Sequence, residues 1–177
     1  DHSRQQGPHA YFIQVEPGNK FAGTVDPGMD QVLVYHLDPV GAKLSPNKPT
    51  SCSVTPGSGP RHLAFHPNGH QAYLIAEMGS TMSLLEYRPA AGAFKVKQTL
   101  STLPSDFKGH NSGAEVLVHP SGNFVYGSNR GHNSIAVFAA EPTTDTLTLV
   151  QNQSTEGKTP RHFAIDPSGK WLLAENQ

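Results

Sequence analysis

The chain has 177 residues, of which 36% are hydrophobic, and its 13 Lys and Arg nearly balance 14 Asp and Glu, for a formal net charge of −1. This balance argues against a nucleic-acid-binding surface, and no apolar run approaches the length that crosses a membrane. Cys52 is the single cysteine, which excludes an internal disulfide and a CxxC metal site. The 17 Gly and 15 Pro favour many short strands joined by turns.

The first repeat, residues 7–58, predicts an antiparallel meander. Three strands are expected, at 7–15, 20–25 and 31–37. A short outer strand is expected at 41–44, and residues 48–59, rich in Pro, Ser and Thr, are expected to form a connector.

The second repeat, residues 59–112, has the same order of parts. Its first stretch, GPRHLAFHPNGHQAYLIAEMGSTMSLLEY at 59–87, contains three strand patterns separated by turn signals at 67–69 and 78–80. Alternation at Phe94 and Val96 predicts a polar outer strand that forms an edge.

The third repeat covers residues 113–159, and a fourth begins at Pro160 and holds only the first hairpin within 160–177. The turn prolines Pro17, Pro67, Pro120 and Pro167 recur with a period of about 50 residues, which is typical of propeller blades. We therefore expect an all-β fold, a β-propeller of antiparallel four-stranded blades, with about three and a half blades in one domain. The remaining blades are expected from a longer chain, or exposed blade edges are expected to self-associate.

Polar residues at one rim of this propeller are the candidate site. In a meander, the start of the inner strand and the end of its returning neighbour lie at the same rim. This places six residues on one face near the central channel: His9, Asp26, Arg61, Glu77, Arg130 and Arg161. The loop residues His110, Asn111, His132 and Asn133 are expected toward the same face.

Each candidate also has a purely structural interpretation. Arg61 and Arg161 share a Pro-Arg-His context, and a repeated arginine is often an architectural ion-pair partner. Glu77 could neutralise Arg61, and His9 could hold a turn. Arg130 stands where the other repeats have Asp, Glu or Gln, and such variation at a shared rim indicates a binding site.

The opposite rim carries Glu16, His66, His119 and Asp166, each just before a turn proline, and these are predicted to stabilise β-turns. No metal centre is expected at the candidate site, because arginines lie among its carboxylates. No GxSxG nucleophile motif is present.

Four motifs carry a resemblance to a known family: GPH at Gly7, GPRHLAFHPNG at Gly59, the glutamate Glu77, and YGSNRGHNSIAVF at Tyr126. Over essentially its whole length the chain resembles the seven-bladed propeller lactonases. That family includes a bacterial type of 6-phosphogluconolactonase and a fungal 3-carboxy-cis,cis-muconate lactonizing enzyme. The chain departs from the family pattern at Tyr11, where GPHAH has a second histidine, and at 26–28, where the family has DLG.

The resemblance implies catalytic roles for His9, Arg61, Glu77 and Arg130. We expect substrate contacts from Arg61, Arg130, Asp26, His110, Asn111, His132 and Arg161.

The implied activity is hydrolysis of a small anionic lactone, most simply 6-phosphogluconolactone, without a cofactor. The arginines would hold anionic groups and the oxyanion, and Glu77 or His9 would move the proton. One alternative is cycloisomerisation of a carboxymuconate by the same residues. Another is a non-catalytic propeller whose rim binds a protein partner. The sequence leaves the compartment open, and we favour the cytoplasm.

Overall fold

The computed structural model describes residues 3–177, which form fourteen strands and no helix. The first sheet has the order β1-β2-β3-β4, with β1 Phe12–Val15, β2 Phe21–Asp26, β3 Gln31–Asp38 and β4 Lys43–Ser53. The second has the order β5-β6-β7-β8, with β5 Pro60–Phe65, β6 Gln71–Ala76, β7 Thr81–Arg88 and β8 Ala93–Ser101. The third holds β9 Ser112–Val118, β10 Phe124–Arg130, β11 Ser134–Glu141 and β12 Thr146–Ser154. β13 Pro160–Ile165 and β14 Leu172–Asn176 form a two-stranded sheet.

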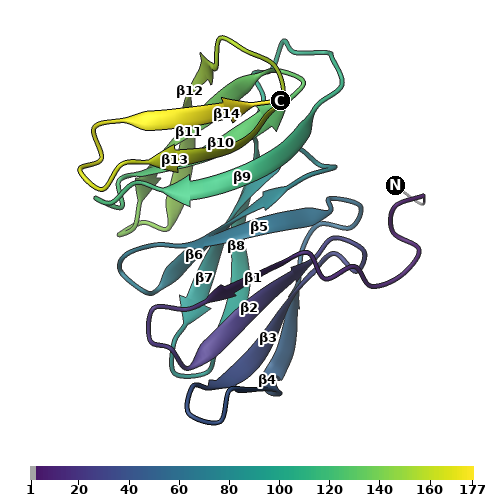
Figure 1. Cartoon of the computed structure of the whole chain (residues 1–177), viewed down its shortest axis with the longest axis vertical. Coiled ribbons are helices and arrows are strands. Elements are labelled where there is room, and N and C mark those ends of the chain that lie inside the picture. Colours follow the sequence, from purple (N-terminus) through teal and green to yellow (C-terminus); the bar gives the residue numbers. More distant parts are fainter. Residues whose placement is uncertain (1–2) are drawn as a thin grey trace.

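The sheets follow one another along the long axis of the molecule, from the purple first sheet to the yellow strands β13 and β14 (Figure 1). Every strand pair is antiparallel, and the first strands of successive sheets contact one another: β1 with β5, β5 with β9, and β9 with β13. These first strands line a hollow of about 550 Å³ that includes Phe12, Leu63 and Val116. The arrangement is that of propeller blades around a channel, so the all-β propeller prediction is confirmed.

Apolar clusters between neighbouring blades hold the stack together. Ile75 and Met82 of the second blade are fully buried in one cluster with Val116 and Phe138 of the third. A second cluster joins the first two blades through residues such as Val32 and Leu85. Burying one such side chain contributes about 1.5–3 kcal/mol. All six residues of β6 are buried. Glu77 directly follows this strand, so its backbone is attached to a well-packed part of the blade.

Two strands differ from their predicted bounds. β1 begins only at Phe12, because the His9 N–H donates to the Asp26 carboxylate at 2.9 Å instead of to a backbone carbonyl of β2. β4 extends to Ser53, through residues expected to form a connector. Its prolines fit because β4 is the outermost strand of its sheet, where a missing N–H breaks no inner ladder.

The turns at the rim opposite the candidate site are tied down as predicted. The Glu16 carboxylate accepts from the Gly18 N–H at 2.7 Å, and His66 Nδ1 accepts from the Asn68 N–H at 3.0 Å. The His66 Nε2 also bonds the Gly122 carbonyl of the next blade at 3.0 Å, and His119 repeats this contact to Gly169. These imidazoles therefore join neighbouring blades.

Among the residues described, no helix is long and apolar enough to cross a membrane.

Candidate active site

Glu77 is the centre of a cluster of charged side chains at one rim. Its Oε2 lies 3.2 Å from Arg61 Nε, and its Oε1 lies 3.1 Å from Arg130 Nη2 and 2.8 Å from Arg4 Nη2. The Arg61 side chain is 3% exposed, and those of Glu77 and Arg130 are both 14% exposed. Three guanidinium groups therefore surround one shielded carboxylate.

The backbone ladders bring this cluster together. Pro60 at the start of β5 pairs with Ala76 at the end of β6, so Arg61 and Glu77 lie at the same rim. The Glu77 N–H donates to the Gly59 carbonyl at 2.7 Å, and the Glu77 carbonyl accepts from the Gly113 N–H of the next blade at 3.0 Å. Glu77 is thus fixed at the joint between the second and third blades.

Arg61 uses its other nitrogens to reach both neighbouring blades. Its Nη1 donates to the Ala114 carbonyl at 2.6 Å, and its Nη2 donates to the Tyr11 hydroxyl at 2.8 Å. The guanidinium also lies over the Tyr11 ring, 4.9 Å from the centroid, as a cation–π contact. Arg130 donates from Nη2 to the Gly113 carbonyl at 3.1 Å. Among the described residues, the buried Nε of Arg61 and that of Arg130 have no aligned hydrogen-bond acceptor.

The charges in the cluster set the protonation of Glu77. Burial pushes its pKa upward, but the hydrogen bond from Arg4 and the positive charge of Arg130 outweigh burial and hold the pKa below its ordinary value. Burial, and to a smaller extent repulsion from Arg130, lowers the pKa of Arg61 below its ordinary value. Glu77 is consequently an ionised carboxylate near neutral pH.

A second buried carboxylate, Glu115, lies one position along β9 from Ala114. Its Oε1 accepts from His62 Nδ1 at 2.7 Å and its Oε2 from His162 Nδ1 at 2.6 Å. The Glu115 side chain is 8% exposed, and hydrogen bonds from the histidines, led by His62, overcome burial to lower its pKa. The bridge crosses three consecutive blades.

Two hollows adjoin the cluster. The channel hollow, about 350 Å³, is lined by Tyr11, Arg61, His62, Glu115, Arg161, His162, Glu175, Asn176 and Gln177. The rim hollow, about 370 Å³, is lined by Ser3, Arg4, His9, Tyr11, Pro27 and Met78. Tyr11 lines both, and volumes of this order accommodate a small polar ligand.

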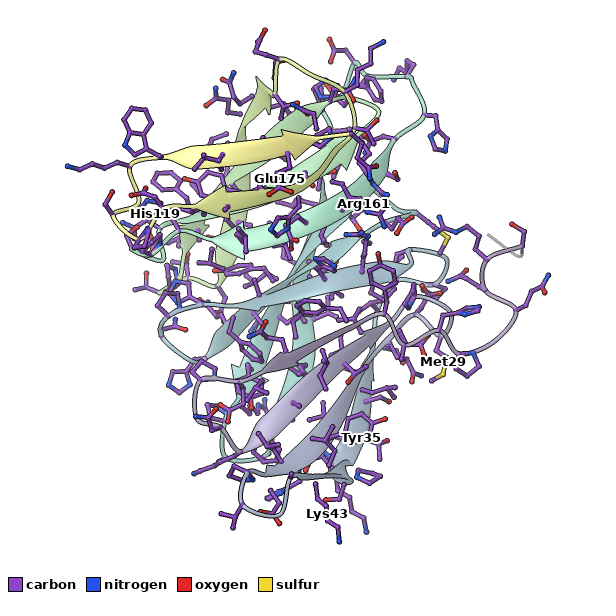
Figure 2. The ribbon with its side chains drawn as sticks, viewed as in Figure 1. Met29, Tyr35, Lys43, His119, Arg161 and Glu175 are labelled. Carbon is purple, nitrogen blue, oxygen red and sulfur yellow. The ribbon has the colours of Figure 1, made fainter. Side chains whose placement is uncertain are left out.

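The other predicted residues occupy different surroundings. His9 is exposed in the rim hollow, whereas Asp26 is 1% exposed and its carboxylate accepts backbone N–H groups of His9, Gly28 and Met29. Asp26 therefore acts on this segment through the backbone. Arg161 lines the channel hollow, and Figure 2 shows it at the rim opposite His119.

Two of the loop residues, Asn111 and His132, form a separate network. Asn111 Nδ2 donates to Ser80 Oγ at 2.9 Å, and its Oδ1 accepts from the His132 N–H at 3.0 Å. His132 Nδ1 bonds Ser134 Oγ at 2.7 Å, and His110 is exposed. Asn111 and His132 thus join the 101–112 loop to the turn before β11.

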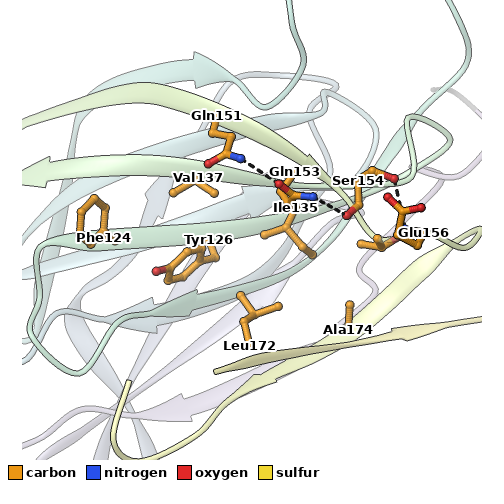
Figure 3. A pocket seen from close by; sticks show the side chains of 11 residues that line it. Phe124, Tyr126, Ile135, Val137, Gln151, Gln153, Ser154, Glu156, Leu172 and Ala174 are labelled. Carbon is orange, nitrogen blue, oxygen red and sulfur yellow. Dashed lines mark hydrogen bonds between the residues drawn. The ribbon is translucent and has the colours of Figure 1, made fainter. Parts of the chain in front are cut away.

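A larger hollow, about 570 Å³, lies away from this cluster, between the third blade and β14 (Figure 3). Phe124, Tyr126, Val137 and Leu172 give it an apolar lining, and no residue of the Glu77 cluster belongs to it. The described residues contain no group of His, Cys, Asp and Glu side chains arranged to hold a metal ion.

Sequence reasoning did not assign site roles to Arg4, Tyr11, His62, Glu115 or His162. The repeat alignment contained a signal for three of them, because His62, Glu115 and His162 occupy equivalent positions of successive blades. Alternation of His, Glu and His at one inner-strand position predicts a carboxylate bridge. Arg4 precedes the first repeat, and alignment offers no counterpart for it.

A family model described as lactonase, 7-bladed beta-propeller, matches residues 1–177. The chain belongs to this family. It is 40% identical over 177 residues to the 6-phosphogluconolactonase of Bacillus subtilis (strain 168), a match that covers 99% of this chain and 49% of that protein. The resemblance stated from sequence motifs is thereby confirmed.

Solved structures also match the chain over nearly its whole length. The periplasmic gluconolactonase of Pseudomonas aeruginosa superposes with a TM-score of 0.92 at 32% identity, covering 99% of this chain and 49% of that one. A putative 6-phosphogluconolactonase from Bacteroides fragilis NCTC 9343 gives 0.89 at 33% identity, covering 99% and 50%. The chain spans about half the length of the curated relatives it matches, and so holds about half of a seven-bladed propeller.

Proposed function

We propose that the full-length protein containing this chain is a lactonase that hydrolyses a small anionic sugar lactone, with 6-phosphogluconolactone as its substrate. The Bacillus subtilis relative is named 6-phosphogluconolactonase. The Bacteroides fragilis structure is named a putative 6-phosphogluconolactonase, and the Pseudomonas aeruginosa structure a periplasmic gluconolactonase. The observation that carries the proposal is the ionised Glu77 carboxylate beside Arg4, Arg61 and Arg130. This site combines a base with an excess of positive charge.

Glu77 would act as the general base. It accepts a proton from water while the water oxygen bonds to the lactone carbonyl carbon and the carbonyl electron pair moves to oxygen. The ring C–O bond then breaks, and the ring oxygen leaves as a hydroxyl after taking up a proton. Exposed in the rim hollow, His9 is the proposed proton donor for this leaving oxygen.

The arginines divide between holding the base and holding the substrate. Arg61 is almost fully buried, so we propose that it acts mainly by fixing Glu77. Arg130 is more exposed, and Arg161 lines the channel hollow, so both are proposed to contact the phosphate or carboxylate of the substrate. Asn111 and His132 of the loop network, with the exposed His110, are proposed to contact the substrate. Asp26 is proposed to act indirectly, through its hydrogen bond to the His9 backbone.

The test is turnover of 6-phosphogluconolactone by the full-length protein, measured above the spontaneous rate, with Glu77→Gln as the variant. Removing the base while keeping the shape is expected to reduce kcat by about 100-fold or more with KM largely kept. Glu86→Gln is the matched control, because Glu86 lies on β7 and pairs with Arg88 outside the cluster. Full turnover by Glu77→Gln would transfer the base role to His9.

Two other outcomes identify the alternative functions. Conversion of 3-carboxymuconate without lactone hydrolysis would show a cycloisomerase that uses the same charged cluster. Absence of turnover with both substrates would contradict an enzymatic role and leave a propeller that binds a partner through its rim.

We further propose that the rest of the propeller comes from the same longer chain. The relatives are about twice as long, and the apolar residues Phe124, Tyr126 and Leu172 line a hollow beside a sheet of only two strands. Intact mass with sedimentation of the natural protein tests this. A 19.0 kDa chain that self-associates through its blade edges would contradict it.

A further inference from the structure

Tyr11 combines three contacts that the proposed mechanism leaves unused. Its backbone N–H donates to the Val25 carbonyl at 3.0 Å, which fixes the segment before β1. Its hydroxyl accepts from Arg61 Nη2 at 2.8 Å, and its ring lies beneath the same guanidinium. Tyr11 is nevertheless 46% exposed and lines both the channel hollow and the rim hollow.

Arg61 holds Tyr11 and Glu77 through one rigid, planar group. Its Nε lies 3.2 Å from the Glu77 carboxylate, while its Nη2 bonds the Tyr11 hydroxyl. The guanidinium therefore fixes the distance between a base and a phenol. Tyr11 lines the rim hollow together with His9 and with Arg4, whose Nη2 lies 2.8 Å from Glu77 Oε1.

The direction of the Arg61 to Tyr11 hydrogen bond determines what the hydroxyl can do. A guanidinium only donates, so the Tyr11 oxygen is the acceptor and its own hydrogen stays free for another partner. Accepting a bond from a cation polarises the O–H and strengthens it as a donor. A strong neutral donor beside an ionised base is the combination that attack of water on a carbonyl requires.

We propose that Tyr11 is a further catalytic residue, which donates its hydroxyl hydrogen bond to the lactone carbonyl oxygen while Glu77 takes the proton of the attacking water. This inference rests on the proposed lactonase function. As the water oxygen bonds to the carbonyl carbon, the carbonyl electron pair moves to the oxygen that Tyr11 faces. Tyr11 keeps its proton throughout, and the bond it donates strengthens as that oxygen becomes negative.

The test is Tyr11→Phe in the full-length protein, because this change removes the hydroxyl and keeps the ring beneath Arg61. We expect kcat to fall by about 100-fold, the effect of losing one oxyanion donor, with KM and Tm close to wild type. Tyr35→Phe is the control, since Tyr35 lies on β3 away from the cluster (Figure 2). Combining Tyr11→Phe with Glu77→Gln should cost less than the two separate losses multiplied, because both act in one step.

The outcomes separate this inference from the function on which it depends. Absence of lactone hydrolysis by the wild-type protein overturns the proposed function itself. An active wild type with an equally active Tyr11→Phe overturns the catalytic role of Tyr11. A parallel fall in Tm and kcat for Tyr11→Phe also overturns it, because it shows that the hydroxyl serves only to support Arg61.

Discussion

The ion pair between Arg61 and Glu77, Nε to Oε2 at 3.2 Å, forms at an irregularity in the ladder: Pro60 pairs with Ala76 and His62 with Ile75, so Arg61 is the extra residue of β5 beside the end of β6. The antiparallel ladder between β5 and β6 holds the backbone of both residues at this rim. The pair is therefore part of the blade and precedes any substrate. Arg130 and Arg4 approach the same carboxylate from other parts of the chain.

Arg61 and Arg130 are expected to respond differently to replacement by lysine. Arg61→Lys keeps the charge but loses the bonds to Ala114 and Tyr11, which should lower the free energy of unfolding by about 1–3 kcal/mol. Arg130→Lys should leave stability nearly unchanged and weaken binding of substrate or inorganic phosphate about tenfold, as the planar fork is lost. Urea unfolding and titration calorimetry measure the two effects. Wild-type stability and affinity in both variants would show that neither guanidinium group contributes more than its charge.

The lowered pKa of Glu77 predicts the acid side of the activity profile. With ionised Glu77 as the proposed base, kcat/KM should stay constant down to pH 4.5, its ordinary pKa, and fall only below it. Arg4→Gln removes a hydrogen bond and a charge that lower this pKa, so the acid limb should move to higher pH. Arg88→Gln, which breaks an exposed pair with Glu86, is the control that should move nothing.

Stability should depend on Glu77 in the same direction. A folded-state pKa below the ordinary value means that its contribution is complete above pH 4.5 and is lost as the pH falls through the folded-state pKa. The difference in unfolding free energy between wild type and Glu77→Gln should therefore shrink in acid. A difference that grows on acidification would contradict the lowered pKa.

The Glu115 bridge is expected to stabilise the contact between blades. Glu115→Gln leaves two imidazoles without their carboxylate and should reduce the free energy of unfolding by about 1–3 kcal/mol at pH 7. Glu141→Gln changes an exposed glutamate on β11 and serves as the matched control. Equal stability of the two variants in urea would show that the bridge is energetically neutral.

The turn glycines allow a paired test of the imidazole contacts between blades. A Cβ on Gly122 would lie 2.5 Å from His66 Nε2, whereas a Cβ on Gly69 would meet nothing within 4 Å, although their φ angles are 79° and 70°. Gly69→Ala should show the cost of a positive φ alone, about 1 kcal/mol, and Gly122→Ala should cost more because the His66 ring must move. Equal losses of unfolding free energy in the two variants would mean that the His66 imidazole can move aside at no cost.

Much of the site was predictable from the repeat because antiparallel geometry fixes which strand ends share a rim. From the sequence alone, that argument predicted that Arg61, Glu77 and Arg130 lie at the same rim, and the structure places them in contact. It could not reveal how far each side chain is buried, and Asp26 illustrates the limit: it lies at the rim, yet its carboxylate is occupied by backbone N–H groups. Burial depends on packing between repeats, which the strand pattern does not encode.

Contacts outside the repeat pattern were not predictable. Arg4 reaches Glu77 across 73 positions of sequence, from a segment that has no counterpart in the other blades. The extension of β4 was missed for another reason: its prolines read as a connector, and only its place at the outer edge makes them compatible with a strand. In both cases the structure depends on which segments lie side by side in space, and the local sequence does not contain that information.

The charged cluster and the Tyr11 that adjoins it come from consecutive blades: Tyr11 from the first, Arg61 and Glu77 from the second, and Arg130 from the third. The relative tilt of these blades therefore sets the spacing of the proposed catalytic groups, and a displacement of about 0.5 Å is enough to disturb such a geometry. The turnover rate would then depend on the tilt between blades throughout the propeller ring. A substitution in a distant blade that opens or tightens the ring should change kcat without touching the substrate.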